Sequence, residues 1–158
     1  MYFESILEIL RKEDVKGISP EQIEHLQNRL GVSFPASILE ALSLIGYKAF
    51  DLNGMNSLMH AHAGSLDTVK FEEQQLVFKQ SFLEKRAEAP PPKHLLIDIW
   101  DLHYYYAFVL VDDLKPDPPV YLYDPSDGNY KEYAPSYSHY MLNSSLINFY
   151  YEESLYDD

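Results

Sequence analysis

Hydrophobic residues recur every three or four positions in the first part of the chain, which is the spacing of amphipathic helices. The pattern predicts three short helices, over 2–13, from Pro20 to Gly31 and from Pro35 to Gly46. Ser19 can cap the second helix through its hydroxyl group, and Gln22 completes a capping box with it. Pro20 suits the first helical turn because it has no amide donor, and Gly31 supplies the left-handed residue that ends the helix.

The second and third predicted helices are joined by a tight turn, an arrangement that some DNA-binding proteins use. The whole chain holds 12 Lys and Arg residues against 25 Asp and Glu residues, a formal net charge of −13. DNA binding draws much of its affinity from Lys and Arg, and these two helices offer Arg29 beside Glu21, Glu24 and Glu40. We therefore predict that the helix pair is scaffold and that the protein binds no nucleic acid. The side chains expected to pack against the rest of the fold are Leu30, Phe34, Leu39 and Leu42.

The middle of the chain changes character twice. Residues 47–64 are irregular, apart from a short strand pattern at 58–62. Helical spacing returns over 66–88, and the polar run 72–75 leaves open whether this helix is continuous. The apolar positions of this pattern are Leu66, Val69, Leu76, Phe82 and Leu83. Three prolines at 90–92 end the helix and act as a rigid spacer.

Strand-like segments replace the helical pattern after these prolines. They are rich in β-branched and aromatic residues, and short polar or proline-rich connections separate them. The predicted strands are 94–100, 104–111, 119–124 and a short one at 130–133. The stretch 124–129 has the composition of a tight turn, with a glycine able to adopt positive φ. Ser136 can cap a last helix.

This order of elements predicts an α+β fold: helices, then an antiparallel meander, then a helix. We expect the N-terminal helices to pack on a central antiparallel sheet, with the helices segregated on one face. A length of 158 residues suits a single domain over 1–158, with a short, less ordered tail near 152–158.

Composition excludes several further features. The chain contains no cysteine, so disulfides and thiolate metal sites are excluded. No apolar run reaches the length of a membrane span. The N-terminal stretch MYFESILEILRKED is amphipathic and contains an early acid, so it lacks the basic start and apolar centre of a signal peptide. We therefore expect a cytoplasmic protein that does not bind membranes.

Charge and tyrosine are both concentrated in the second half of the sequence. Residues 94–158 hold twelve acidic residues and two lysines, a net charge of −10, and twelve of the fourteen tyrosines lie beyond residue 100. An acidic, tyrosine-rich region suits a basic protein partner and repels nucleic acid and anionic membrane. The alternative is that the charge serves solubility and the tyrosines form a core.

Tyr104, Tyr105 and Tyr106 alternate between the two faces of their predicted strand, so one set must pack in the core. The other set can line a surface beside acids at the strand ends, where rings supply contact area and carboxylates steer the partner. The candidate partner-binding residues are Tyr104, Tyr106, Asp112, Asp113, Asp117, Tyr121, Tyr123, Asp124 and Asp127. The alternative is a sheet with both faces buried, in which these tyrosines belong to the core.

Two stretches hold candidate metal ligands. His60 and His62 would lie on one side of a strand, but a third ligand of fixed geometry is not evident. The stretch that starts at Asp124 is similar to a calcium loop, yet its sixth and twelfth positions are Asn129 and Pro135 where Gly and Glu are needed. We therefore predict no metal site.

Asp98, Asp101 and His103 are candidate acid–base groups by their residue types. No nucleophile elbow and no glycine-rich phosphate loop accompany them. We predict a protein that is not an enzyme and needs no cofactor. A metal-dependent enzyme that uses His60 and His62 is the less favoured alternative.

Several weak motifs occur in a fixed order. They are Leu30–Pro35 followed by Leu42 and Gly46, the strand pair Tyr105–Val111 and Pro119–Tyr123, and the helix opening Ser136–Met141. Together they resemble the signature of the SUKH superfamily, also called the Smi/Knr family. The resemblance covers roughly residues 20–150.

That resemblance implies a non-catalytic binding module. Many bacterial members of the family are immunity proteins that neutralise secreted toxins, often nucleases, whereas some fungal relatives are scaffolds in cell-wall signalling. We expect an immunity protein that binds a basic cognate toxin domain and blocks it by occlusion. A scaffold or regulatory adaptor on the same fold is the alternative, and the sequence does not fix the oligomeric state.

Overall fold

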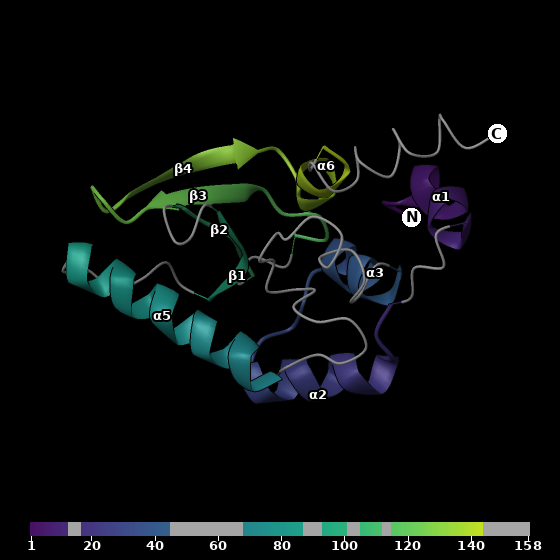
Figure 1. Ribbon diagram of the computed structural model, residues 1–158, viewed down its shortest axis with the longest axis horizontal. Helices are drawn as coiled ribbons and strands as arrows, with labels where there is room; N and C mark the ends of the chain where they lie inside the picture. Colours follow the sequence, from purple (N-terminus) through teal and green to yellow (C-terminus); the bar gives the residue numbers. More distant parts are fainter. Residues whose placement is uncertain (13–16, 45–67, 87–92, 101–104, 112–114, 144–158) are drawn as a thin grey trace.

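A four-stranded antiparallel sheet lies between helices in the computed structural model (Figure 1). The structure describes residues 1–12, 17–44, 68–86, 93–100, 105–111 and 115–143. Its helical elements are the 3-10 helix η1 (Glu4–Ile6), α1 (Leu7–Lys12), α2 (Pro20–Leu30), α3 (Ala36–Leu44), α5 (Thr68–Arg86) and α6 (Tyr137–Leu142). Its strands are β1 (His94–Trp100), β2 (Tyr105–Leu110), β3 (Val120–Asp124) and β4 (Asn129–Ala134). The predicted α+β class is therefore confirmed.

The ends of α2 form as local sequence chemistry dictates. The Ser19 hydroxyl accepts a hydrogen bond from the Gln22 amide at 3.2 Å, and the Gln22 side-chain oxygen accepts from the Ser19 amide at 3.0 Å. Gly31 follows the last residue of the helix in a left-handed conformation with φ of 67°. The predicted capping box and helix end are both confirmed.

The sheet is a simple meander with the strand order β1-β2-β3-β4 and antiparallel pairing throughout. The turn between β3 and β4 is closed by a hydrogen bond from the Gly128 amide to the Asp124 carbonyl oxygen at 2.9 Å. Gly128 has φ of 74°, which an L side chain adopts only at a cost, so the predicted role of this glycine is confirmed.

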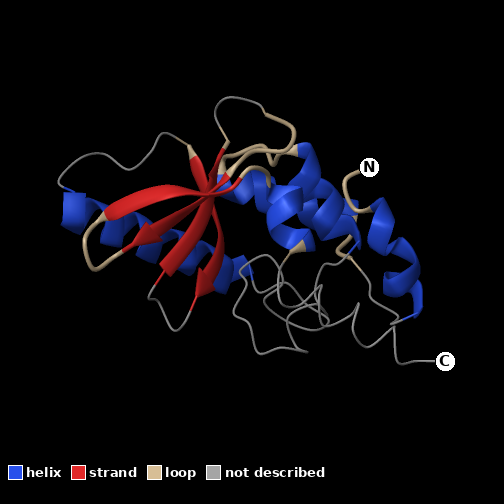
Figure 2. Cartoon of the chain, turned by 90° about the horizontal axis from the view of Figure 1, so that it is seen from above, coloured by secondary structure: helices blue, strands red, loops and turns tan. Residues whose placement is uncertain are grey.

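Helix α5 covers one face of the sheet (Figure 2). Phe78 lies against Phe108 and Tyr123, with ring centroids 5.3 and 5.6 Å apart, and Phe82 lies 5.0 Å from Tyr123. All four side chains are buried. This aromatic layer places the large rings of β2 and β3 between the sheet and the helix, where their apolar area is removed from water.

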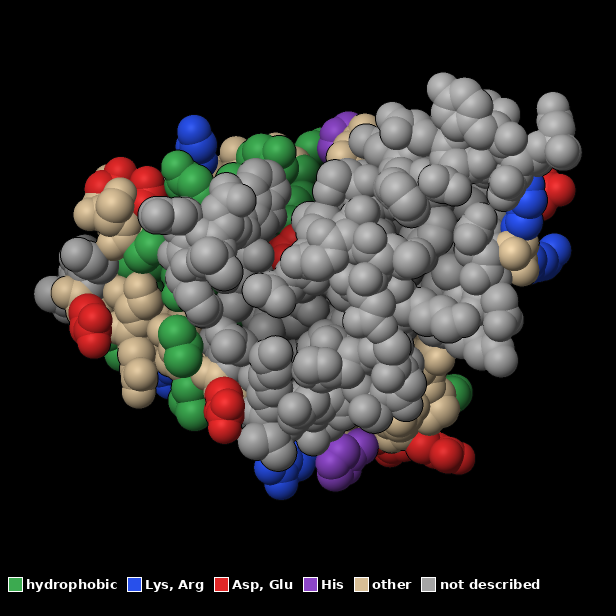
Figure 3. Space-filling view, in the orientation of Figure 1, with side chains coloured by type: hydrophobic (Ala, Val, Ile, Leu, Met, Phe, Trp, Pro, Cys, Tyr) green, Lys and Arg blue, Asp and Glu red, His purple; other side chains and the backbone are tan. Residues whose placement is uncertain are grey.

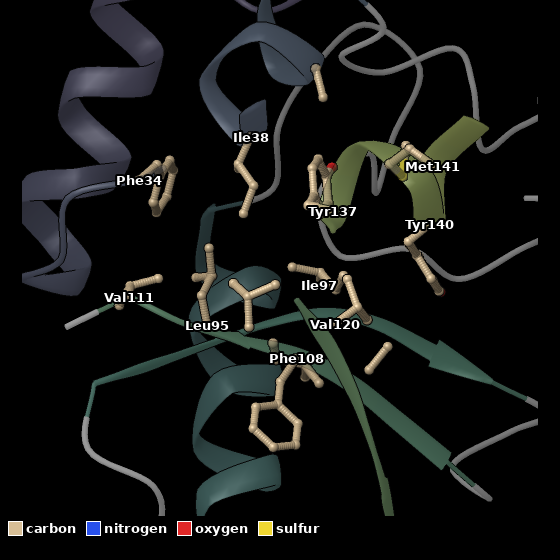
Figure 4. Packing of buried hydrophobic residues seen from close by; sticks show 14 of the residues in the cluster. Phe34, Ile38, Leu95, Ile97, Phe108, Val111, Val120, Tyr137, Tyr140 and Met141 are labelled. Carbon is tan, nitrogen blue, oxygen red and sulfur yellow. The ribbon is translucent and has the colours of Figure 1, made fainter. Parts of the chain in front are cut away.

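The opposite face of the sheet packs against α3, α6 and the segment before α3. Figure 4 shows Ile38 and Tyr137 above the sheet, opposite Ile97 and Val120, whereas Phe108 points to the other side. Helices therefore cover both faces, and the prediction that they are segregated on one face is wrong. The physical reason lies in β2, where the consecutive residues 106–109 are all apolar and all buried, as two-sided burial requires.

The apolar positions of the predicted helix over 66–88 do not all face the sheet. Phe82 is buried, whereas Leu76 and Leu83 are 58% and 40% exposed. Phe78, which was not among those positions, is also buried, and the helix runs unbroken through the polar stretch 72–75. Of the side chains expected to pack from the helix pair, Phe34 and Leu42 are buried, whereas Leu30 and Leu39 are half-buried against the core.

Some expectations fall on parts of the chain outside the described residues. These are the strand pattern at 58–62, Gly46, the continuation of the last helix beyond residue 143 and the tail at 152–158. Within the described parts, no helix combines the length and the apolar character needed to cross a membrane.

Candidate partner-binding surface

Acidic and aromatic side chains come together on the β3–β4 hairpin. We define the hairpin surface as the partly or fully exposed residues Asp124, Asp127, Tyr130, Glu132 and Tyr133. In the space-filling view, acidic side chains gather at the end of the hairpin beside hydrophobic side chains of the sheet (Figure 3). A surface of this composition offers both charge and ring area to a partner.

The two carboxylates of the turn are held in place by local hydrogen bonds. One oxygen of Asp124 accepts from the Ser126 amide at 2.9 Å and from the Ser126 hydroxyl at 2.7 Å. Asp127 accepts from the Asn129 amide at 2.8 Å. The side-chain and backbone hydrogen bonds from Ser126 lower the pKa of Asp124 below its ordinary value, so this carboxylate is negatively charged at neutral pH.

The exposed tyrosines lie on different sides of the hairpin. The Tyr130 ring is 37% exposed and packs 5.9 Å from Tyr121 and 5.8 Å from Phe82, so it lies on the α5 side of the sheet. Tyr133 is 51% exposed and lies 6.1 Å from Tyr140 of α6. Each ring is supported by the core on one side and is open to solvent on the other, which limits the entropy that it loses on binding.

The structure places two of the predicted contact residues in the core. Tyr123 is fully buried, and its hydroxyl donates to the Ser81 carbonyl oxygen at 3.0 Å. Tyr106 is 4% exposed, and burial, together with Tyr123, raises the pKa of its hydroxyl. Their assignment as surface anchors is corrected, because both rings join the sheet to α5 and neither can reach a partner in this arrangement.

Asp117 has a structural partner within the chain. Its carboxylate accepts from the amide of Ser138 at 2.9 Å and also from the hydroxyl of the same serine, so it anchors the first turn of α6. Tyr121 is half-buried beside Tyr130. Of the predicted residues, Asp124 and Asp127 are the ones that the structure brings together on the hairpin. Tyr104, Asp112 and Asp113 lie outside the described residues.

Three residues of the hairpin surface were missed by sequence reasoning: Tyr130, Glu132 and Tyr133. The signal that identifies them is the position of β4 at the end of the strand order, which leaves five of its six residues exposed. That signal depends on the pairing of the strands, which the spacing of residues in β4 alone does not provide.

The candidates for catalysis and metal binding are not assembled in the described part of the chain. Asp98 is buried and accepts a hydrogen bond from the Tyr140 hydroxyl at 2.8 Å, so it serves the packing of α6 against β1. Asp101 and His103, like His60 and His62, lie outside the described residues. Among the residues that the structure does describe, no group of three or more His, Cys, Asp or Glu side chains is arranged to hold a metal ion.

Comparison with known proteins agrees with the order of motifs in the sequence. A comparison with curated proteins gave no match. The model of the SMI1/KNR4 family (SUKH-1) matches residues 17–143, from the glycine before α2 to the end of α6. This range contains every strand of the sheet and the helices that cover its two faces. The resemblance to the SUKH superfamily is thereby confirmed, and the chain belongs to the SMI1/KNR4 family (SUKH-1).

Proposed function

We propose that this protein is a non-catalytic binding module that neutralises a cognate secreted toxin. Membership of the SUKH-1 family supports a protein-binding role of the immunity type. The observation that carries the proposal is the hairpin surface, which combines the carboxylates of Asp124, Asp127 and Glu132 with the exposed rings of Tyr130 and Tyr133 in a chain of net charge −13.

The mechanism is occlusion combined with charge mimicry. A toxin that cleaves nucleic acid carries a basic groove for phosphates, and the carboxylates of the hairpin surface would stand where those phosphates bind. Complementary charge speeds the encounter of two proteins, while buried aromatic contacts slow their separation. Tyr104, Asp112 and Asp113, which lie outside the described residues, stay in this proposal as additional contacts, and the cytoplasm of the producing cell is the proposed place of action.

Growth protection in a bacterial host tests this function. The toxin domain is the one encoded beside this protein in its genome, expressed under a regulated promoter together with the wild-type chain or a variant. We expect the wild-type chain to restore growth. Reversing the hairpin acids, as Asp124→Lys, Asp127→Lys and Glu132→Lys together, should abolish or strongly reduce protection.

A matched control reverses three exposed acids of the N-terminal helices, as Glu8→Lys, Glu21→Lys and Glu24→Lys. This control changes the net charge by the same amount away from the hairpin surface, so it should still protect. A wild-type chain that binds the toxin without restoring growth would reject the immunity role and identify an adaptor. Equal loss of protection in both triple variants would reject the hairpin surface as the binding site.

A further inference from the structure

The two edges of the sheet are not equivalent. At β1, the side-chain amide of Gln75 on α5 donates to the Leu96 carbonyl oxygen at 3.0 Å and accepts from the Leu96 amide at 3.0 Å. This side chain makes the pair of hydrogen bonds that a neighbouring strand would make to the same residue. Leu96 itself is buried, so α5 covers the β1 edge at this residue.

The β4 edge is built differently. β4 pairs with β3 and is last in the strand order, so no strand of the described residues lies on its outer side (Figure 1). Pairing with β3 is regular over 129–132 and shifts register between Glu132 and Ala134, so alternate residues of 129–132 direct their N–H and C=O groups away from the sheet. Five of the six residues of β4 are exposed, including Lys131 and Glu132 at its centre, so the outer side of this part of the strand is accessible.

The charges of β4 disfavour pairing with a second copy of the chain. In a two-fold symmetric antiparallel pair, the alternation of faces requires that one residue lies opposite its own copy. In the two central registers this residue is Lys131 or Glu132, so two ammonium groups or two carboxylates face each other. Like charges directly opposite destabilise a strand pair. A strand with the complementary order of charges meets no such repulsion.

We propose that the partner docks by adding an extended segment to the outer side of β4, with a basic residue opposite Glu132 and an acidic residue opposite Lys131. The proposal rests on the proposed function, because it assigns the partner's mode of contact at the hairpin surface. Asp127 at the turn favours a further basic residue on the same segment. The main-chain hydrogen bonds of such a strand supply affinity, and the charge order supplies selection.

Two synthetic β-hairpin peptides test this mode of contact on the full chain. The outer strand of the first reads Val-Thr-Lys-Glu-Tyr-Thr, so that in antiparallel pairing Lys lies opposite Glu132 and Glu lies opposite Lys131. The second exchanges Lys and Glu and keeps the composition. Affinity is measured by fluorescence anisotropy, and the contacted segment is located by amide hydrogen exchange.

We expect the first peptide to bind about tenfold more tightly than the second, since two favourable cross-strand charge pairs become two repulsive ones. The double variant Lys131→Glu with Glu132→Lys keeps the net charge and should reverse this preference. Bound peptide should slow exchange at the β4 amides. Absence of binding by both peptides, equal affinities that the double variant leaves unchanged, or slowed exchange confined to other elements would each overturn the proposal.

Protection assays with the toxin distinguish strand addition from the proposed function. Reversing the hairpin acids is the test of toxin neutralisation, whereas the charge exchange in β4 is the test of strand addition. Protection that survives exchange of Lys131 and Glu132, but is lost on reversal of the hairpin acids, would keep the immunity role and reject strand addition. A peptide preference that reverses in the double variant supports strand addition even where no toxin is neutralised.

Discussion

At the scale of single residues, a few polar groups and glycines fix how the elements meet. Gln75 is half-buried and pairs with both backbone groups of Leu96. Gly17 lies where a Cβ atom would come within 1.8 Å of the Ser43 carbonyl oxygen, so the chain can pass α3 there only without a side chain. Neither role is visible in the residue types themselves, because each depends on a neighbour distant in sequence.

Replacing Gln75 tests the closure of the β1 edge. Gln75→Leu removes both hydrogen bonds and leaves the amide and carbonyl of Leu96 unsatisfied, so the free energy of unfolding should fall by about 1–3 kcal/mol. Chemical denaturation measures the change. Gln80→Leu on the exposed side of the same helix is the matched control and should change stability by less than about 0.5 kcal/mol. Equal stabilities of the two variants would contradict the role of Gln75.

Two glycine substitutions separate steric clash from backbone conformation. Gly17→Ala forces the added carbon against backbone atoms of α3, and overpacking of this kind costs about 1–3 kcal/mol or more. At Gly31 the added carbon has no neighbour within 4 Å, so Gly31→Ala should cost only the left-handed conformation, about 1–2 kcal/mol. Thermal unfolding ranks the two variants, and Gly17→Ala is expected to be the less stable. A wild-type melting temperature for Gly17→Ala would show that α3 does not approach this residue so closely.

The turn carboxylate gives a pH dependence with a defined sign. The pKa of Asp124 is lowered from 3.8 by Ser126, so its contribution to stability is present above its unfolded pKa and is lost as pH falls through the lower folded pKa. Ser126→Ala removes the side-chain donor and should move the pKa of Asp124 back toward 3.8. NMR titration of the carboxyl carbon measures this pKa in both proteins. An identical pKa in wild type and variant would exclude Ser126 as the cause.

At the scale of elements, two buried tyrosines attach α6 to the sheet, and they differ in the hydrogen bonding of their hydroxyl groups. The Tyr140 hydroxyl donates to the buried carboxylate of Asp98 at 2.8 Å. The Tyr137 hydroxyl is buried without a hydrogen bond to any described residue, and burial, with Asp98 and Asp117 nearby, raises its pKa strongly. Of the two tyrosines of this helix, one therefore has a hydrogen bond to the sheet, whereas the other has no partner among the described residues.

Removing each hydroxyl should have unequal effects on stability. Tyr140→Phe takes a donor from a buried carboxylate, so the free energy of unfolding should fall by about 1–3 kcal/mol. Tyr137→Phe removes a buried group that makes no such bond, so it should be neutral or stabilising. Equilibrium denaturation of the two variants compares them directly, and a larger loss for Tyr137→Phe would contradict the packing of α6 described above.

What the sequence predicts well at this scale is local chemistry. The capping box at Ser19, the glycine end of α2 and the turn at Gly128 are correct because each depends on residues within a few positions. The strands are recognised because their residues prefer extended structure. The buried side of α5 and the covered faces of the sheet cannot be recognised from such local preferences. Helix α5 carries Leu76 and Leu83 on one side and Phe78 and Phe82 on another. Only tertiary packing selects between these two sides.

The candidate site is predictable only where it depends on composition or on local sequence. An acidic, tyrosine-rich half of the chain is a compositional fact, and the acids of the β3–β4 turn follow from local turn chemistry. Assigning individual tyrosines requires knowing that helices cover both faces of the sheet, which places Tyr106 of β2 and Tyr123 of β3 in the core and leaves Tyr130 and Tyr133 exposed on β4. Alternation along a strand gives two sets of residues but does not say whether either set is exposed.

At the scale of the whole molecule, the packed core and the proposed recognition surface lie in different parts of the fold. Helices cover both faces of the sheet and α5 covers part of the β1 edge, so β4 is the most exposed strand among the described residues. Asp124 and Asp127 are held by hydrogen bonds within the turn, and Tyr130 and Tyr133 pack against the core on one side. This arrangement suits a surface that meets a basic partner without rearranging the core.

Association kinetics at two salt concentrations test the proposal that the hairpin surface recognises a basic toxin domain. The wild-type chain should bind quickly at low salt and more slowly at high salt, because steering between opposite charges is screened. Reversing Asp124, Asp127 and Glu132 to Lys should lower the association rate more than it raises the dissociation rate. Reversing Glu8, Glu21 and Glu24 should have a smaller effect. Binding that is indifferent to salt and to the hairpin reversals, but is abolished by the reversals on the N-terminal helices, would contradict the account.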